Sequence, residues 1–166
     1  MKIFLQLIRY VAWFVAASFL IGLSVATAGP FGFEFGENVS IYQCPELPGN
    51  PGYYKCIKAP KPHSAFESYV LKASNSHGIC WIKAIGRDIN DNSFGSSTKA
   101  EVNNLASQLK KKYGSSEISD FVLRNALWDD PDEWLMAIAQ KERVYAFQWK
   151  GLSLPDEPSL SNIALI

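Results

Sequence analysis

Hydrophobic and polar residues follow the clearest pattern between Gly78 and Gly114, where they predict a strand, a polar loop and a helix. Residues 79–89 are rich in β-branched and aromatic side chains, and both faces of an extended chain would be largely apolar there. This pattern is typical of an interior strand that is covered on both sides. The Asn, Asp, Ser and Gly residues over 90–97 predict a loop, because these side chains hydrogen-bond to their local backbone.

The helix is predicted over residues 98–113. Thr98 and Glu101 have the spacing of a capping box, and Gly114 can end the helix in a left-handed conformation. The apolar stripe recurs at three- and four-residue intervals and comprises Val102, Leu105, Ala106, Leu109 and Tyr113. Three lysines at 110–112 oppose the negative end of the helix dipole. Each large stripe residue stabilises by about 1.5–3 kcal/mol when buried, against about 1 kcal/mol for a cap, so packing onto a sheet should decide this helix.

Alternating apolar residues predict the other strands. These are the segments 30–35, 53–57, 66–73 and 143–149, with a short edge strand at 163–166. A turn at 75–78 would join the 66–73 strand to the strand that follows it in a hairpin. We therefore expect one antiparallel sheet of about five strands.

A second, short helix is predicted over residues 131–140. Asp130 can cap it, Pro131 suits its first position, and acidic residues fill its first turn. Segment 117–127 is ambiguous between helix and strand, because its apolar spacing suits a helix but its serines do not. The expected fold class is α+β, with helix 98–113 packed on one face of the sheet and helix 131–140 nearby.

The first 28 residues have the layout of a secretory signal peptide. Lys2 and Arg9 precede an uncharged apolar run over 10–26, and Ala26 and Ala28 are the small residues of a cleavage site. Cleavage after Ala28 would leave residues 29–166 as a single exported, periplasmic domain. The alternative is an uncleaved anchor in the inner membrane, since about 17–20 apolar residues can just span a bilayer.

Charge argues against nucleic acid as a partner. The chain has 16 basic and 16 acidic residues, and signal cleavage would remove two of the basic ones. Phosphate binding needs a basic face, and the only basic run is the lysine group at 110–112, which is explained by the helix end. Membrane contact is expected only if the signal is not cleaved.

Three cysteines permit one disulfide in an oxidising compartment. We favour Cys44–Cys56, because the Pro- and Gly-rich segment between them can form a tight turn. Cys80 would then be a small residue of the core. A Cys56–Cys80 bridge between neighbouring strands is the alternative.

Candidate chemistry is sparse, and no catalytic residue, cofactor or metal site is predicted. His63 and His77 are expected in exposed loops, outside any zinc-binding motif. Asp88, Asn90 and Asn92 have the first three spacings of a calcium loop, but the later positions lack its glycine and glutamate. No serine lies in a nucleophile-elbow motif.

Aromatic residues are numerous, and most should lie in the core. Tyr53 and Tyr54 beside the proline turn, together with Trp128 before two aspartates, could instead form an exposed recognition surface.

Four segments carry a resemblance: PFGFEFG at 30–36, GICWIKAIGRDI at 78–89, KKYG at 111–114 and DEWLMAIAQKERVYAFQW at 132–149. With them the chain resembles small exported proteins of Gram-negative bacteria. The resemblance implies a periplasmic α+β domain and brings no activity or site residues with it.

The function expected from these observations is a non-catalytic exported binding module whose partner is another envelope protein, in the manner of an inhibitor or immunity protein. One alternative is a small envelope hydrolase that uses His63 or His77. Another is a structural accessory protein of the envelope, held by an uncleaved signal.

Overall fold

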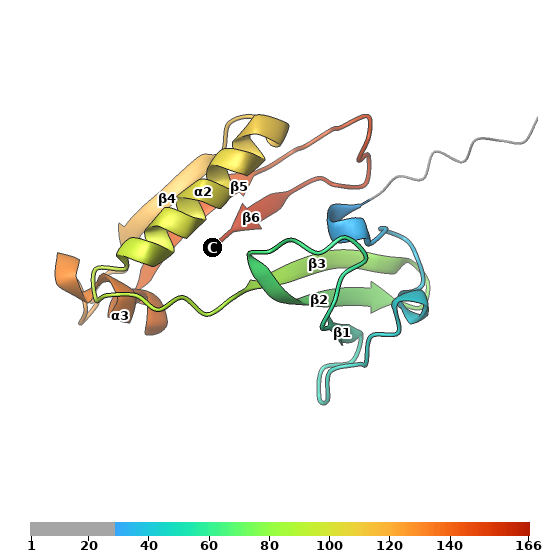
Figure 1. Cartoon of the computed structure of the whole chain (residues 1–166), viewed down its shortest axis with the longest axis horizontal. Coiled ribbons are helices and arrows are strands. Elements are labelled where there is room, and N and C mark those ends of the chain that lie inside the picture. Colours follow the sequence, from blue (N-terminus) through green and yellow to red (C-terminus); the bar gives the residue numbers. More distant parts are fainter. Residues whose placement is uncertain (1–28) are drawn as a thin grey trace, which may run out of the picture.

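The computed structural model describes residues 29–166, which form two three-stranded antiparallel sheets and two α-helices (Figure 1). The N-terminal sheet has the order β1-β2-β3, with β1 at Tyr53–Cys56, β2 at Phe66–Ser74 and β3 at Gly78–Gly86. The C-terminal sheet has the order β4-β5-β6, with β4 at Glu117–Val122, β5 at Arg143–Trp149 and β6 at Ile163–Leu165. The helices are α2 at Ser96–Tyr113 and α3 at Trp134–Ala139, with 3-10 turns at η1 (Pro30–Gly32), η2 (Val39–Tyr42) and η3 (Pro131–Glu133).

The α+β class is confirmed, but the prediction of a single sheet of about five strands is wrong. Both edges of the N-terminal sheet are occupied by nearby chain. On the β1 edge, the Lys55 amide donates to the Pro45 carbonyl (2.9 Å); on the β3 edge, the Ile79 amide donates to the Glu37 carbonyl (2.9 Å). These hydrogen bonds occupy the β1 edge and the beginning of the β3 edge, and the later strands form a sheet of their own. Figure 1 shows the two sheets side by side, with the segment after β3 running from one to the other.

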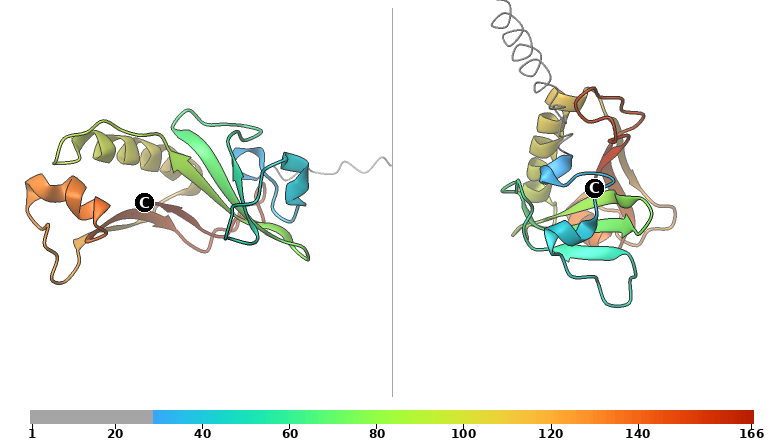
Figure 2. Two further views of the ribbon diagram at one scale, coloured as in Figure 1. Left: turned by 90° about the horizontal axis from the view of Figure 1, so that it is seen from below. Right: turned by 90° about the vertical axis from the view of Figure 1, so that its right-hand side faces the viewer.

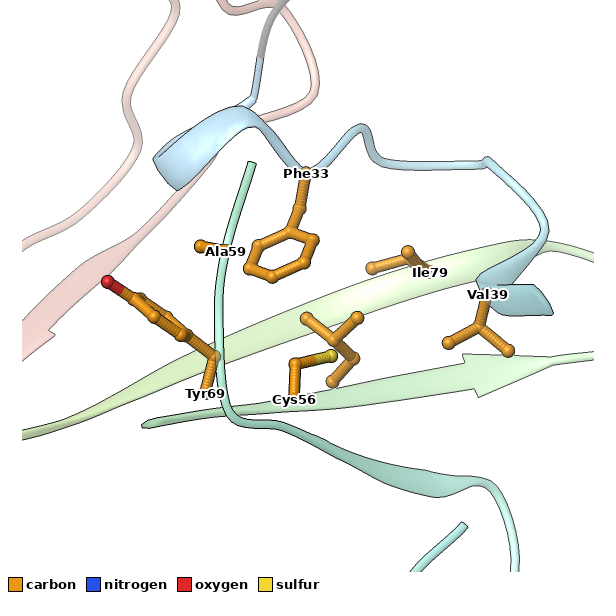
Figure 3. Close-up of a cluster of buried hydrophobic side chains, with 7 residues drawn as sticks. Phe33, Val39, Cys56, Ala59, Tyr69 and Ile79 are labelled. Atoms are coloured by element: carbon orange, nitrogen blue, oxygen red, sulfur yellow. The ribbon is translucent and has the colours of Figure 1, made fainter. Parts of the chain in front are cut away.

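The inner face of the N-terminal sheet packs against the chain that precedes it. Phe33 is fully buried there, with its ring 5.7 Å from that of Tyr69 and 5.0 Å from that of Tyr42. Figure 3 shows Phe33 facing Ala59, Ile79 and Tyr69 across this cluster.

The strand predicted at 30–35 is wrong, because Phe31 adopts a left-handed conformation (φ 59°) and the segment turns through η1. An extended segment would keep its alternate side chains in line along one side. In the turn the rings of Phe31 and Phe33 also lie on one side, where both contact the ring of Tyr69.

The hairpin prediction is confirmed, since β2 and β3 pair in antiparallel fashion. The prediction that the strand after the turn is interior is wrong: β2 is the central strand, and β3 lies at an edge. The register shifts between Lys72 and Ala73, so that Lys72 pairs with Trp81 and Ala73 with Ile79. Cys80 is the extra residue of this bulge. It is exposed, and its expected place in the core is therefore also wrong.

Helix α2 packs through its predicted stripe, but on the C-terminal sheet. Ala106 is buried against Phe147 and Trp149 of β5, with Val102, Leu109 and Tyr113 of the stripe around them. The Trp149 indole N–H donates to the carbonyl of Gly114 (2.9 Å), which ties the helix end to the sheet. The ambiguous segment 117–127 begins with β4, which pairs with β5.

Helix α3 covers the same side of β5 as α2. The Trp134 ring lies 5.6 Å from that of Tyr145, which in turn donates its hydroxyl hydrogen to Asn103 Oδ1 of α2 (2.9 Å). The predicted start of this helix is confirmed by η3, where the Asp130 amide donates to the Glu133 carboxylate (3.4 Å). Figure 2 shows both helices on one side of the C-terminal sheet.

The beginning of α2 is capped by residues that precede it. Asp91 accepts from the amides of Ser97 (2.9 Å) and Thr98 (2.7 Å), and Asn92 Oδ1 accepts from the Ser96 amide (3.3 Å). The predicted Thr98–Glu101 capping box is therefore wrong, because Thr98 already lies inside the helix. Desolvation acts to raise the pKa of Asp91, but hydrogen bonds from Thr98, Ser97 and Asn92 outweigh it and hold that pKa well below its usual range.

We expect the substitution Asp91→Ala to lower the midpoint of thermal unfolding by several degrees near pH 7, because three amides at the helix start lose their acceptor. The pKa of Asp91 is lower in the folded chain than in the unfolded one. Its ionisation therefore stabilises the fold above about pH 4, and this contribution disappears as the pH falls through the folded-state pKa.

Thermal unfolding followed by circular dichroism from about pH 7 down to about pH 2 should accordingly show the gap between wild type and D91A narrowing. Asp88→Ala, which removes an exposed aspartate from the same segment, is the control and should change little. A gap that stays constant over this range would contradict the role given to the ionised carboxylate.

Gly95, directly before α2, is a second position that constrains how this helix begins. It has φ 69°, and an added Cβ would overlap the six-membered ring of Trp134. We expect Gly95→Ala to cost about 2–4 kcal/mol of unfolding free energy, from left-handed strain and the displaced indole together. Gly49→Ala has similar strain (φ 76°) but open space around it, so it should cost only about 1 kcal/mol. Equal losses in chemical denaturation would show that the Trp134 contact contributes nothing.

Candidate recognition surface

The outer face of the N-terminal sheet carries an aromatic row. Tyr53 of β1 pairs with Lys72 of β2, which pairs with Trp81 of β3, so the three side chains stand in line across the sheet. The Tyr53 and Trp81 rings lean towards each other edge to face, with centroids 6.4 Å apart. Lys72 Nζ lies 5.3 Å from the Tyr53 ring centre, within the range of a cation–π interaction. Trp81 remains 43% exposed.

A second row adds charge beside the first. Lys55 pairs with Val70, which pairs with Lys83, so two exposed lysines flank a half-buried valine. We call the face formed by both rows the outer face; its residues are Tyr53, Lys55, Val70, Lys72, Trp81 and Lys83.

None of the three outer-face lysines has a carboxylate partner among residues 29–166. The ion pairs of the described chain lie elsewhere: Lys112–Glu157, Arg143–Asp120 and Lys150–Glu117. A cationic face with an exposed tryptophan and a half-buried tyrosine therefore stands opposite the packed inner face of the same sheet.

A disulfide fixes the position of β1, the strand that carries Tyr53 and Lys55 of the outer face. Cys44 and Cys56 are bonded, with Cα atoms 4.9 Å apart, which confirms the predicted pairing. Cys56 ends β1, and Pro45 follows Cys44 along the β1 edge, so the bridge holds this edge segment against the strand that carries Tyr53 and Lys55.

The predicted recognition residues are not brought together. Tyr53 lies on the outer face, but Tyr54 points to the inner face and packs against the buried cluster around Phe33. Trp128 lies beyond β4, where its amide donates to Glu142 (3.0 Å). Neighbouring residues of a strand face opposite sides, so adjacent tyrosines in β1 could not share one surface.

Trp81 was missed as a surface residue because β3 was predicted to be covered on both sides. The signal that could have found it is Lys83: two residues apart on a strand, Trp81 and Lys83 share a face. A lysine on that face points to solvent, which indicates that its neighbours are accessible as well.

The two histidines lie apart from the outer-face rows. His63 Nδ1 accepts from the Ala65 amide (3.2 Å), and its ring packs 5.6 Å from that of Phe66. His77 lies in the exposed β2–β3 turn, where its Nδ1 is 2.7 Å from the Ser76 hydroxyl. In the part of the chain that the structure describes, no group of three or more His, Cys, Asp or Glu residues is placed to hold a metal ion.

Comparisons with protein families, with curated proteins and with solved structures give no match for this chain.

We expect the double substitution Cys44→Ser with Cys56→Ser to lower the unfolding free energy by about 3 kcal/mol, because the bridge closes a loop of 12 residues' separation. Denaturant unfolding should show the same loss when the wild-type protein is reduced. Alkylation of the native, unreduced protein followed by mass mapping should label Cys80 alone. Labelling of Cys44 without reductant would contradict the pairing.

Proposed function

We propose that this chain is an exported protein-binding module and that the outer face is its binding site. The single observation that carries the proposal is the row of Tyr53, Lys72 and Trp81, in which Lys72 and Trp81 are exposed and Tyr53 is half-buried. Tryptophan and tyrosine are the side chains most enriched at energetically important positions of protein interfaces. Rings that stay accessible in the free protein gain from burial in a complex.

Rigidity of the sheet supports the proposal. The inner side chains on β2 and β3, Leu71 and Ile79, are almost wholly buried, and the disulfide holds β1. The outer-face side chains therefore stand on strands whose positions are set before a partner arrives. A preformed site avoids part of the ordering cost of association.

An oxidising compartment also fits. The disulfide is of the kind that persists outside the cytosol. No helix within residues 29–166 is long and apolar enough to cross a membrane. The signal peptide and its cleavage after Ala28 lie outside the described residues and stay predictions; with them, the proposed partner is another protein of the envelope, bound in the manner of an inhibitor or immunity protein.

The proposal predicts that tagged protein purified from the periplasm captures a reproducible partner from periplasmic extract and that Trp81→Ala abolishes the capture. Phe121→Ala is the matched control, because that ring is similarly exposed (50%) on β4 of the other sheet. It should leave capture unchanged. Reproducible absence of any partner, or a partner that W81A still holds, would overturn the proposal.

The hydrolase alternative is separated by the same assay. Joint substitution of His63 and His77 by alanine should leave capture intact if the chain is a binding module. A phenotype lost with both histidines while the fold and the captured partner are retained would instead favour an enzyme.

A further inference from the structure

Resting on the proposed function, we infer that the partner presents an extended acidic segment to the outer face, with carboxylates placed around an apolar side chain. Three features of the outer face indicate such a partner: its lysines have no carboxylate partner within residues 29–166, Val70 lies between two of them, and Lys72 lies over the Tyr53 ring.

The charge of the outer face indicates that the partner is negatively charged. Lys55, Lys72 and Lys83 are all exposed, and the ion pairs of residues 29–166 leave them without a carboxylate. Three like charges on one small face repel each other, and an acidic partner removes that repulsion as it binds. Complementary charges at exposed positions mainly raise the association rate and select the partner.

The distance between the outer-face lysines indicates that the partner segment is extended. Lys55 and Lys83 stand on the two outer strands of the sheet, about 10 Å apart, which is two interstrand spacings. An extended chain covers that span in about three residues. Carboxylates a few residues apart on one extended segment can therefore reach both lysines.

The centre of the face calls for an apolar side chain. Val70 lies between Lys55 and Lys83, and the exposed Trp81 ring borders it in the neighbouring row. A leucine-like or aromatic side chain of the partner would cover Val70 and the rim of Trp81, burying apolar area at the middle of a charged ring. Interfaces commonly have this arrangement of apolar core and polar rim.

The two rings do not form a parallel stacking platform for nucleobases, and one face of Tyr53 is already occupied. Proteins that bind single-stranded nucleic acids stack successive bases on aromatic faces. Here Lys72 Nζ covers the Tyr53 ring, and the Trp81 and Tyr53 rings meet at an interplanar angle of 76°. This geometry favours a peptide over a nucleic acid, and nucleic acid becomes an outcome of the test.

The test measures fluorescence anisotropy with protein purified from the periplasm. The probe is a labelled peptide in which glutamates flank a central pair of leucines, and its control carries glutamines in place of the glutamates. We expect the glutamate peptide to bind, to weaken as salt is raised, and to lose at least about tenfold in affinity on Lys55→Glu with Lys83→Glu. W81A should weaken both the glutamate and the glutamine peptide.

Lys110→Glu with Lys111→Glu is the matched control, because it makes the same change in net charge at exposed positions of α2. It should leave the affinity unchanged. Equal loss in the two double variants, no binding of the glutamate peptide, or tighter binding of oligothymidylate than of that peptide would each overturn the inference. Should the periplasmic capture still depend on Trp81 in that event, the protein-binding function stands and only the acidic partner is wrong.

Discussion

The contact between Trp134 and the backbone of Gly95 is the constraint on which the arrangement of the C-terminal half depends. The indole is buried to 2% exposure and occupies the space that a side chain at position 95 would fill. On its other sides it meets Tyr145 of β5 and the Lys99 ammonium, which lies 4.4 Å from the ring centre. One side chain thus joins the start of α2, the start of α3 and the central strand of the C-terminal sheet.

Because that junction holds both α-helices of residues 29–166, no described helix covers the N-terminal sheet. Its inner face is closed instead by irregular chain, including the turn that carries Phe33 and the segment around Ala59 (Figure 3). These segments pack on one face and leave the other to solvent. The chain after β3 forms its helices on the second sheet, so neither helix covers the outer face of the first. The exposure of Trp81 therefore follows from the topology.

Local patterns predicted what depends on near neighbours in sequence. The α2 stripe, the β2–β3 hairpin and the Asp130–Pro131 helix start each rest on residues a few positions apart, and all are confirmed. The Cys44–Cys56 bridge, also confirmed, spans one turn-forming segment of the chain. The number of sheets was missed because it depends on strand edges whose amides donate to carbonyls of other segments, Lys55 to Pro45 and Ile79 to Glu37. The periodicity of apolar residues along one segment does not indicate which other segment pairs with it.

Two further errors have one cause, which is that alternation assumes a regular backbone. Phe31 takes a positive φ and interrupts the strand pattern of its segment, and the bulge at Cys80 changes which side chains face the core. The cap of α2 was not predicted for a related reason. Asp91 reaches amides six and seven residues ahead, beyond the three-residue spacing of a capping box.

The same bulge explains how the outer face arises. Ile79 on the inner face and Trp81 on the outer face are two residues apart, a separation that in a regular strand puts both on one side. The extra residue, Cys80, reverses the alternation between them. On the other side of β2, the Gly52 carbonyl accepts from the Ala73 amide (2.9 Å) next to Tyr53 and fixes the matching register. The aromatic row is thus set by an irregularity in one strand and a turn beside another, and a β3 of unbroken alternation would turn either Ile79 out of the core or Trp81 into it.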